Sequence, residues 1–264
     1  MLRGCCLIWP MSGTSLKDSH DDHKKIALCL LIGVVCVVCA YLTLFARRAE
    51  IVFLEEEYPE MGAKRLEKHA RDKHILDESP DGAIIVCGDS LMNFWLKDSP
   101  ESWKRFMEPL GCINVATAGD TIGNLRWRIH DGLFDLARPS VIVLCIGTNN
   151  ISINTPDWLV MRGLRSLVHE LKEKYDESIR LVLIPPLNAK EETSMWRFRE
   201  KMLSEPWGRN IYVCPLFKEL QEPGQTRAAD RYMADNVHLS PAGYERIAAP
   251  LSRFVESVKK SGEP

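Results

Sequence analysis

The sequence predicts an α/β fold, in which a parallel five-stranded sheet lies between two layers of helices and is preceded by a single transmembrane helix. Five short apolar runs rich in Val and Ile alternate with segments of helical periodicity, which is the pattern of strand–helix–strand units. The runs are mostly continuous rather than alternating between apolar and polar residues, as expected of strands buried on both faces. A long uncharged stretch near the N-terminus predicts the transmembrane helix.

The transmembrane prediction rests on residues 26–46, which carry no charged side chain. About 20 apolar residues cross the ~30 Å hydrocarbon layer as a helix. A cleaved secretory signal is the main alternative, although its apolar core usually spans only ~7–15 residues. Basic residues flank the run on both sides, so the positive-inside rule does not select an orientation. We therefore expect a single-pass membrane protein and leave open the side on which the rest of the chain lies.

The remaining N-terminal region is polar. Residues 1–25 have a mixed composition without periodicity and are predicted to form a disordered tail. In this tail, Cys5 and Cys6 are candidates for S-palmitoylation next to the membrane. Residues 47–60 are predicted to be a charged juxtamembrane linker, and residues 61–264 to be the globular domain.

The elements of the domain follow in chain order. A charged, solvated helix is expected within residues 50–77, with His69 and His74 on its surface. The predicted strands are 83–87, 112–116, 141–146, 181–184 and 211–214. The clearest amphipathic helices are 122–136, 157–175 and 241–258.

The charge balance and the cysteine positions argue against nucleic-acid binding, disulfides and a zinc site. The chain has 34 basic and 36 acidic side chains, so it has no global electrostatic attraction for nucleic acid. Four of the 9 cysteines lie in or beside the predicted strands, where buried free thiols are favoured over two disulfides. These four show neither a CxxC pair nor a Cys/His ligand spacing, so no zinc site is expected.

Polar groups follow the first three predicted strands where each strand ends, and a fourth group precedes the last helix. These groups are Gly88–Leu91, Thr117–Thr121, Gly147–Asn150 and Asp235–His238. The carboxyl ends of parallel strands meet at one edge of a sheet, which is where ligands bind in such folds. We therefore expect all four groups to converge there.

This set of side chains suits acyl transfer through a serine nucleophile. The hydroxyl of Ser90 needs a base, and His238 is the side chain whose pKa fits that role at neutral pH. Asp235, three residues earlier, can accept a hydrogen bond from the other ring nitrogen. The backbone N–H groups of Ser90 and Gly119 and the side-chain amide of Asn149 are expected to form the oxyanion hole.

Each residue has a structural interpretation when it is taken alone. Serine at the position of Ser90 commonly caps a helix, and Gly119 with Asp120 would form an ordinary turn. Asn149 would lie in a loop, and His238 would be a hydrogen-bonded structural residue. The order of the four groups, each at the end of a predicted strand or the start of a helix, favours the catalytic interpretation.

These motifs resemble the four blocks of the SGNH, or GDSL-type, hydrolases, which supply Ser, Gly, Asn and His. A closer resemblance is to the catalytic subunits of intracellular platelet-activating-factor acetylhydrolase, and it is carried by residues 118–121, 127–128, 138–150 and 238–244. The resemblance covers roughly residues 61–264. It implies a flavodoxin-like three-layer fold and no metal or organic cofactor. It also implies a Ser90, His238 and Asp235 triad, with Gly119 and Asn149 in the oxyanion hole.

The resemblance does not specify the substrate, because Gly123 and Asn124 stand where that branch carries larger polar side chains. We expect a membrane-anchored serine esterase that cleaves small or short-acyl esters, including lipid-derived ones. A non-catalytic binding module of the same fold and an acyltransferase with the same triad remain alternatives. Soluble members of the branch pair, so a homodimer is also left open.

Overall fold

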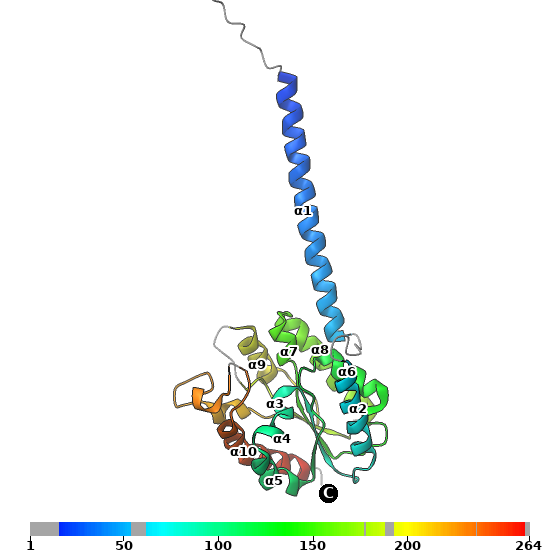
Figure 1. Cartoon of the computed structure of the whole chain (residues 1–264), viewed down its shortest axis with the longest axis vertical. Helices are drawn as coiled ribbons and strands as arrows, with labels where there is room; N and C mark the ends of the chain where they lie inside the picture. The colour runs from blue at the N-terminus through cyan, green and yellow to red at the C-terminus, as the bar shows by residue number, and fades with distance from the viewer. Residues whose placement is uncertain (1–15, 54–61, 177, 188–192, 236, 262–264) are drawn as a thin grey trace, which may run out of the picture. The chain divides into compact units, whose positions relative to one another are not determined.

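The computed structural model describes residues 16–53, 62–176, 178–187, 193–235 and 237–261 (Figure 1). The chain divides into two units, residues 1–47 and 48–264. Residues 1–15, which include Cys5 and Cys6, lie outside the described residues, as do residues 54–60 of the expected linker.

The described part of the first unit is helical. Helix α1 spans Leu16–Phe53, so it begins inside the segment expected to be a tail and continues beyond the apolar run. Its segment Lys25–Arg47 is long and apolar enough to cross a bilayer, and its large apolar side chains are exposed. A signal sequence near the N-terminus meets the same criteria, so the alternative of a cleaved signal stays open. The helix extends past the apolar run because helix propensity depends only weakly on side-chain polarity.

The second unit contains a sheet of five parallel strands in the order β2-β1-β3-β4-β5. The strands are β1 Ile84–Gly88, β2 Cys112–Asn114, β3 Val141–Cys145, β4 Arg180–Leu183 and β5 Ile211–Val213. All five predicted strands are confirmed, with ends that differ by at most two residues. β1 pairs with both β2 and β3, so the ends of these three strands are neighbours.

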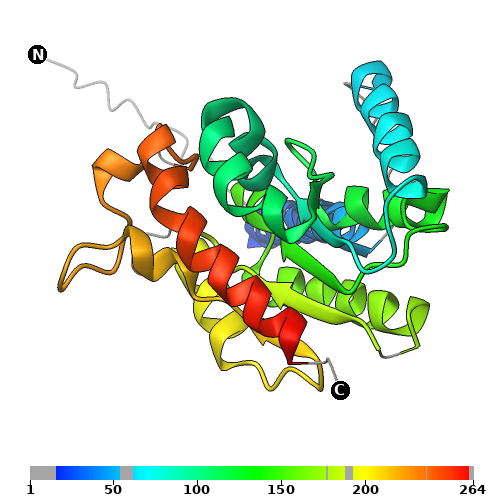
Figure 2. The same cartoon turned by 90° about the horizontal axis from the view of Figure 1, so that it is seen from below.

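Helices cover both faces of the sheet (Figure 2). The helices of this unit are α2 Gly62–Asp77, α3 Ser90–Asn93, α4 Trp95–Asp98, α5 Pro100–Phe106, α6 Ile122–Arg128, α7 Thr148–Ser152, α8 Asp157–Lys174, α9 Ser194–Ser204 and α10 Pro241–Lys260. Ile84 and Val86 of β1 share one apolar core with residues of α3, α4, α5 and α10. Ile85 and Cys87 share the other core with residues of α2, α6, α8 and α9. The predicted three-layer α/β/α architecture is confirmed.

The helix predicted over residues 122–136 is shorter than expected. α6 ends at Arg128, and the chain continues as one π-helical turn, Ile129–Leu133. Within this turn Gly132 has φ +91°, a left-handed conformation that glycine adopts without a steric penalty. The prediction was wrong here because the apolar periodicity continues through the turn while the backbone does not.

Helix α2 corrects a second expectation. His74 is exposed as expected, but His69 is only 4% exposed. Nε2 of His69 lies 2.9 Å from Oδ2 of Asp131 in the π-helical turn. The local pattern suggested a surface residue because the partner that satisfies the buried imidazole lies far along the chain.

The four cysteines of the domain, Cys87, Cys112, Cys145 and Cys214, are free and buried within the described part of the chain. Burial raises the pKa of each thiol, so all four stay protonated at neutral pH. They act as small apolar side chains that pack beside the strands, in agreement with the preference for free thiols over disulfides.

Candidate active site

Ser90 lies where the chain turns from β1 into α3. Gly88 makes this turn with φ +141°, and a Cβ at this position would lie 1.9 Å from the carbonyl oxygen of Cys145 on β3. Only glycine fits that space and that conformation. Asp89 caps the helix, because its Oδ1 accepts a 3.0 Å hydrogen bond from the N–H of Leu91. Ser90 is therefore the first residue of α3, at the carboxyl edge of the sheet.

His238 approaches Ser90 from the loop before α10. Its Nε2 lies 2.9 Å from the Oγ of Ser90, and its Nδ1 lies 2.8 Å from Oδ2 of Asp235. The other oxygen of Asp235 accepts the backbone N–H groups of Val237 and His238 at 2.6 and 2.7 Å. This arrangement favours the tautomer in which Nδ1–H donates to Asp235 and Nε2 is free to accept the serine proton.

Two contacts hold the loop of His238 beside the helix that carries Ser90. The ring of Phe94 lies 5.0 Å from that of His238, centroid to centroid. Tyr244 of α10 is fully buried, and its hydroxyl donates a 3.1 Å hydrogen bond to the backbone carbonyl of Leu91 in α3. The helix that follows His238 is thus tied to the helix that carries Ser90.

The ends of β2 and β3 supply the remaining predicted residues. Gly119 follows β2 with φ +83°, and Asn149 lies in α7 after β3. The Nδ2 of Asn149 donates a 2.9 Å hydrogen bond to the backbone carbonyl of Asp120, so the two loops are joined. Within the described residues, the backbone N–H groups of Ser90 and Gly119 have no hydrogen-bond acceptor.

The structure thus brings the predicted residues together in two sets. Ser90, His238 and Asp235 are joined by direct hydrogen bonds. Gly119 and Asn149 are joined through Asp120, and in the described structure neither makes a direct hydrogen bond to Ser90.

Two carboxyl groups near Ser90 have pKa values that shift in opposite directions. The hydrogen bond from His238 lowers the pKa of Asp235 to about 2, so this group is ionised at neutral pH. Burial raises the pKa of Asp89 to about 7, because its carboxyl group is fully removed from solvent. Only the first is a suitable permanent anion for the histidine.

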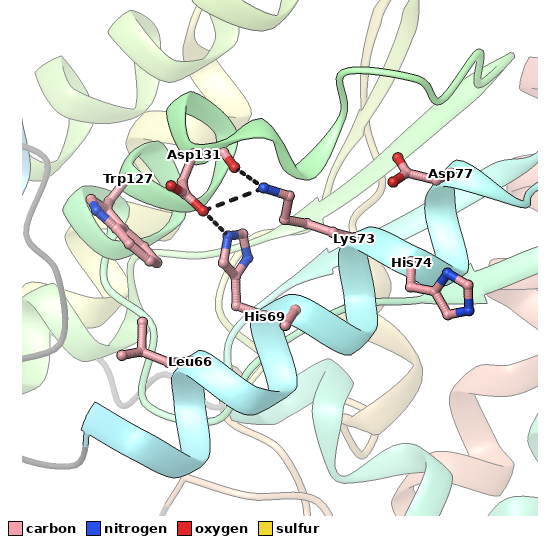
Figure 3. Close-up of a pocket in the computed structure, with 8 residues that line it drawn as sticks. Leu66, His69, Lys73, His74, Asp77, Trp127 and Asp131 are labelled. Carbon is pink, nitrogen blue, oxygen red and sulfur yellow. Dashed lines mark hydrogen bonds and ion pairs between the residues drawn. The ribbon is translucent and has the colours of Figure 1, made fainter.

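A cavity of about 520 Å³ lies between α2 and the π-helical turn (Figure 3), and Ser90 is not among the residues that line it. It is lined by Leu66, His69, Ala70, Lys73, His74, Asp77, Trp127 and Asp131. The His69–Asp131 pair resembles part of a triad, but the lining contains no Ser, Thr or Cys that could act as a nucleophile. This cavity therefore offers no candidate nucleophile, and Ser90 remains the candidate.

Sequence reasoning did not identify two charged side chains beside the site. Asp120 and Arg128 are fully buried, and Oδ2 of Asp120 lies 3.0 Å from Nη1 of Arg128. The signal in the sequence was limited to position, because Asp120 is the residue after Gly119 and Arg128 stands three residues after the apolar Leu125 on the buried side of α6. Charged residues in such positions must be paired when they are buried.

Comparison with known proteins extends these observations. Residues 86–246 match the model of the GDSL-like lipase/acylhydrolase family. The chain is 26% identical over 200 residues to the platelet-activating factor acetylhydrolase IB subunit beta homolog of Drosophila melanogaster, covering 71% of this chain and 83% of that protein. It is 25% identical over 184 residues to the human platelet-activating factor acetylhydrolase IB subunit alpha2, covering 68% and 77%.

A solved structure shares the fold. A GDSL-like lipase from Bacteroides thetaiotaomicron superposes with a TM-score of 0.60 at 18% identity, covering 72% of this chain and 97% of that chain. The family match begins in β1 and ends in α10, so it includes all the predicted site residues. The chain therefore belongs to the GDSL-like lipase/acylhydrolase family, and it is a hydrolase that acts on ester bonds.

Proposed function

We propose that this chain is a membrane-anchored serine esterase that cleaves small or short-acyl esters, with Ser90 as nucleophile, His238 as general base and acid, and Asp235 as the residue that orients the histidine. One observation carries the proposal: the unbroken chain of hydrogen bonds from the Oγ of Ser90 through both ring nitrogens of His238 to Asp235.

In the proposed reaction the Oγ of Ser90 attacks the ester carbonyl carbon while Nε2 of His238 takes the serine proton. The imidazolium that forms is stabilised by the carboxylate of Asp235. His238 then gives the proton to the departing alkoxide as the ester C–O bond breaks, which leaves an acyl group on Ser90. Water, deprotonated by the same histidine, attacks the acyl-enzyme, releases the acid and restores the serine.

The tetrahedral intermediates of both steps carry a negative oxygen. We assign its stabilisation to the N–H groups of Ser90 and Gly119 and to the amide of Asn149. The first two donors are supported by their lack of an acceptor in the described structure. Preorganised donors of this kind are usually the largest single contribution to catalysis of acyl transfer.

The substrate is proposed to be a lipid-derived ester with a short acyl group. Two observations support this choice. The segment Lys25–Arg47 is of a length and composition that would hold the domain next to lipid. The curated relatives are described as acetylhydrolases of a platelet-activating factor, and an acetyl group is a short acyl group.

The test replaces the nucleophile. In the full chain, held in detergent micelles, Ser90→Ala is expected to lower kcat on p-nitrophenyl acetate by about 10⁴-fold or more, with an unchanged melting temperature. A fluorophosphonate probe should label the wild-type chain and not the variant. Labelling that persists in Ser90→Ala would assign the nucleophile elsewhere. A folded wild-type chain that neither turns over nor reacts would support a binding module instead.

A further inference from the structure

Four charged side chains form a continuous series of ion pairs from α2 to the loop that carries Gly119. Nζ of Lys68 lies 2.7 Å from Oδ2 of Asp72, and the same oxygen lies 2.6 Å from Nη2 of Arg128. Nη1 of Arg128 lies 3.0 Å from Oδ2 of Asp120. The side chains of Arg128 and Asp120 have no solvent exposure, and that of Asp72 is 5% exposed.

Such a series of buried ion pairs is weak evidence that these residues serve only to stabilise the fold. Buried ion pairs lose hydration, and well-packed apolar residues of similar volume often replace them without a loss of stability. The charges here are balanced, two cations against two anions, so removing one charge leaves its neighbour uncompensated. The position of these ion pairs in the fold indicates their role.

Arg128 fixes both ends of the loop that carries Gly119. Its Nη2 donates a 2.9 Å hydrogen bond to the backbone carbonyl of Val115, beside the end of β2. Its Nη1 holds the side chain of Asp120, the residue after Gly119. The backbone carbonyl of Asp120 in turn accepts the amide of Asn149. Both loops of the proposed oxyanion hole therefore depend on the position of Asp120.

Helix α2 reaches the same loop at a second point. A Cβ on Gly119 would lie 2.0 Å from Nη2 of Arg65, so this guanidinium lies directly against the glycine. α2 is itself fixed on the π-helical turn, where His69 and Lys73 both contact Asp131 (Figure 3). The helix can therefore act as a rigid support for the loop.

We propose that α2 is a positioning element of the esterase site, in which Asp72 acts through Arg128 to hold Asp120, and with it the donors of Gly119 and Asn149, where the oxyanion forms. This inference rests on the proposed function. It concerns residues 62–77, which precede the 86–246 match to the family model. Asp72 is a positioning residue, because it touches neither the nucleophile nor the expected place of the substrate.

The test uses Asp72→Asn in the full chain, in detergent micelles, with p-nitrophenyl acetate as substrate. Asparagine keeps the size of the side chain and can still accept from Arg128, but it lacks the charge. Displacing the oxyanion donors weakens binding of the transition state more than binding of the substrate. We therefore expect kcat to fall about tenfold while KM changes by less than about twofold. Leu167→Ala is the control for loss of packing, because Leu167 is fully buried in α8 and lies outside both α2 and the ion pairs. This control should lower the melting temperature and leave kcat unchanged below it.

The outcomes separate this inference from the proposed function. An active wild-type chain whose kcat is unchanged by Asp72→Asn overturns the inference alone. Equal losses of kcat in Asp72→Asn and Leu167→Ala, at matched stability, also overturn it, because they indicate general loosening of the domain. A folded wild-type chain without turnover or fluorophosphonate labelling overturns the proposed function and the inference together.

Discussion

The side-chain amide of Asn149 donates a hydrogen bond of 2.9 Å to the backbone carbonyl of Asp120. An asparagine amide has two protons, so one is engaged by the loop after β2 and the other remains available to a substrate. Asn149 therefore joins the two loops and keeps one donor for the proposed oxyanion hole.

We predict that Asn149→Asp lowers kcat by about 10²–10³-fold with little change in KM. A carboxylate cannot donate, and its charge would oppose the negative oxygen of the transition state. Steady-state kinetics on p-nitrophenyl acetate, with a thermal melt of each protein, would measure the effect. Asn149→Ala serves as the control, because it removes the donor without adding a charge and should be the less damaged of the two. Activity within about threefold of wild type in both variants would exclude the amide from the oxyanion hole.

Asp235→Asn should lower kcat by about 10⁴-fold while the loop keeps its fold. The amide oxygen can still accept the backbone N–H groups of Val237 and His238, but the NH₂ group would donate to Nδ1 of His238. The imidazole would then carry its proton on Nε2, facing the Oγ of Ser90, and could not act as the base. The pH dependence of kcat in both proteins provides the measurement. A variant that retains a tenth of wild-type activity would mean that Asp235 does not set the tautomer.

The approach of Ser90 to His238 could be anticipated although 148 residues separate them. The continuous apolar runs predict parallel strands, and parallel strands place their carboxyl ends at one edge. Gly88 ends β1 and Gly119 lies in the loop that follows β2, and both glycines have positive φ. The catalytic roles of these residues remain predictions, since geometry shows where they lie and not what they do.

The interior of the domain beside α2 could not be anticipated in the same way. Asp72 and Arg128 are 56 residues apart, and His69 and Asp131 are 62 residues apart. Apolar periodicity identifies the buried face of a helix only when that face is apolar. A buried charge satisfied by a distant partner has the same local pattern as a solvated one. This is why the sequence suggested a surface for a helix that packs against the loop of Gly119.

The buried carboxyl group of Asp89 leads to a prediction about stability. Its pKa rises from the ordinary value of 3.8 to about 7 in the folded chain. Below about pH 4 it is protonated in both the folded and the unfolded chain. Between about pH 4 and about pH 7, Asp89 is ionised in the unfolded chain but keeps its proton in the folded chain. The stability of the wild type therefore falls as the pH rises, and the loss is complete above about pH 7.

Asparagine does not titrate and caps a helix about as well as aspartate. Asp89→Asn should therefore be more stable than the wild type above about pH 7, by a few kcal/mol at most since each pKa unit is worth about 1.4 kcal/mol. Its advantage should be smaller at about pH 5. Asp235→Asn is the control of opposite sign. The pKa of Asp235 is lowered from 3.8 to about 2, so its carboxylate stabilises the folded chain at neutral pH, and this stabilisation is lost only as the pH falls from about 4 toward about 2. Thermal unfolding of the three proteins at about pH 5 and 8 would measure both differences. A melting temperature for Asp89→Asn that tracks the wild type at both pH values would mean that Asp89 is ionised in the folded chain throughout.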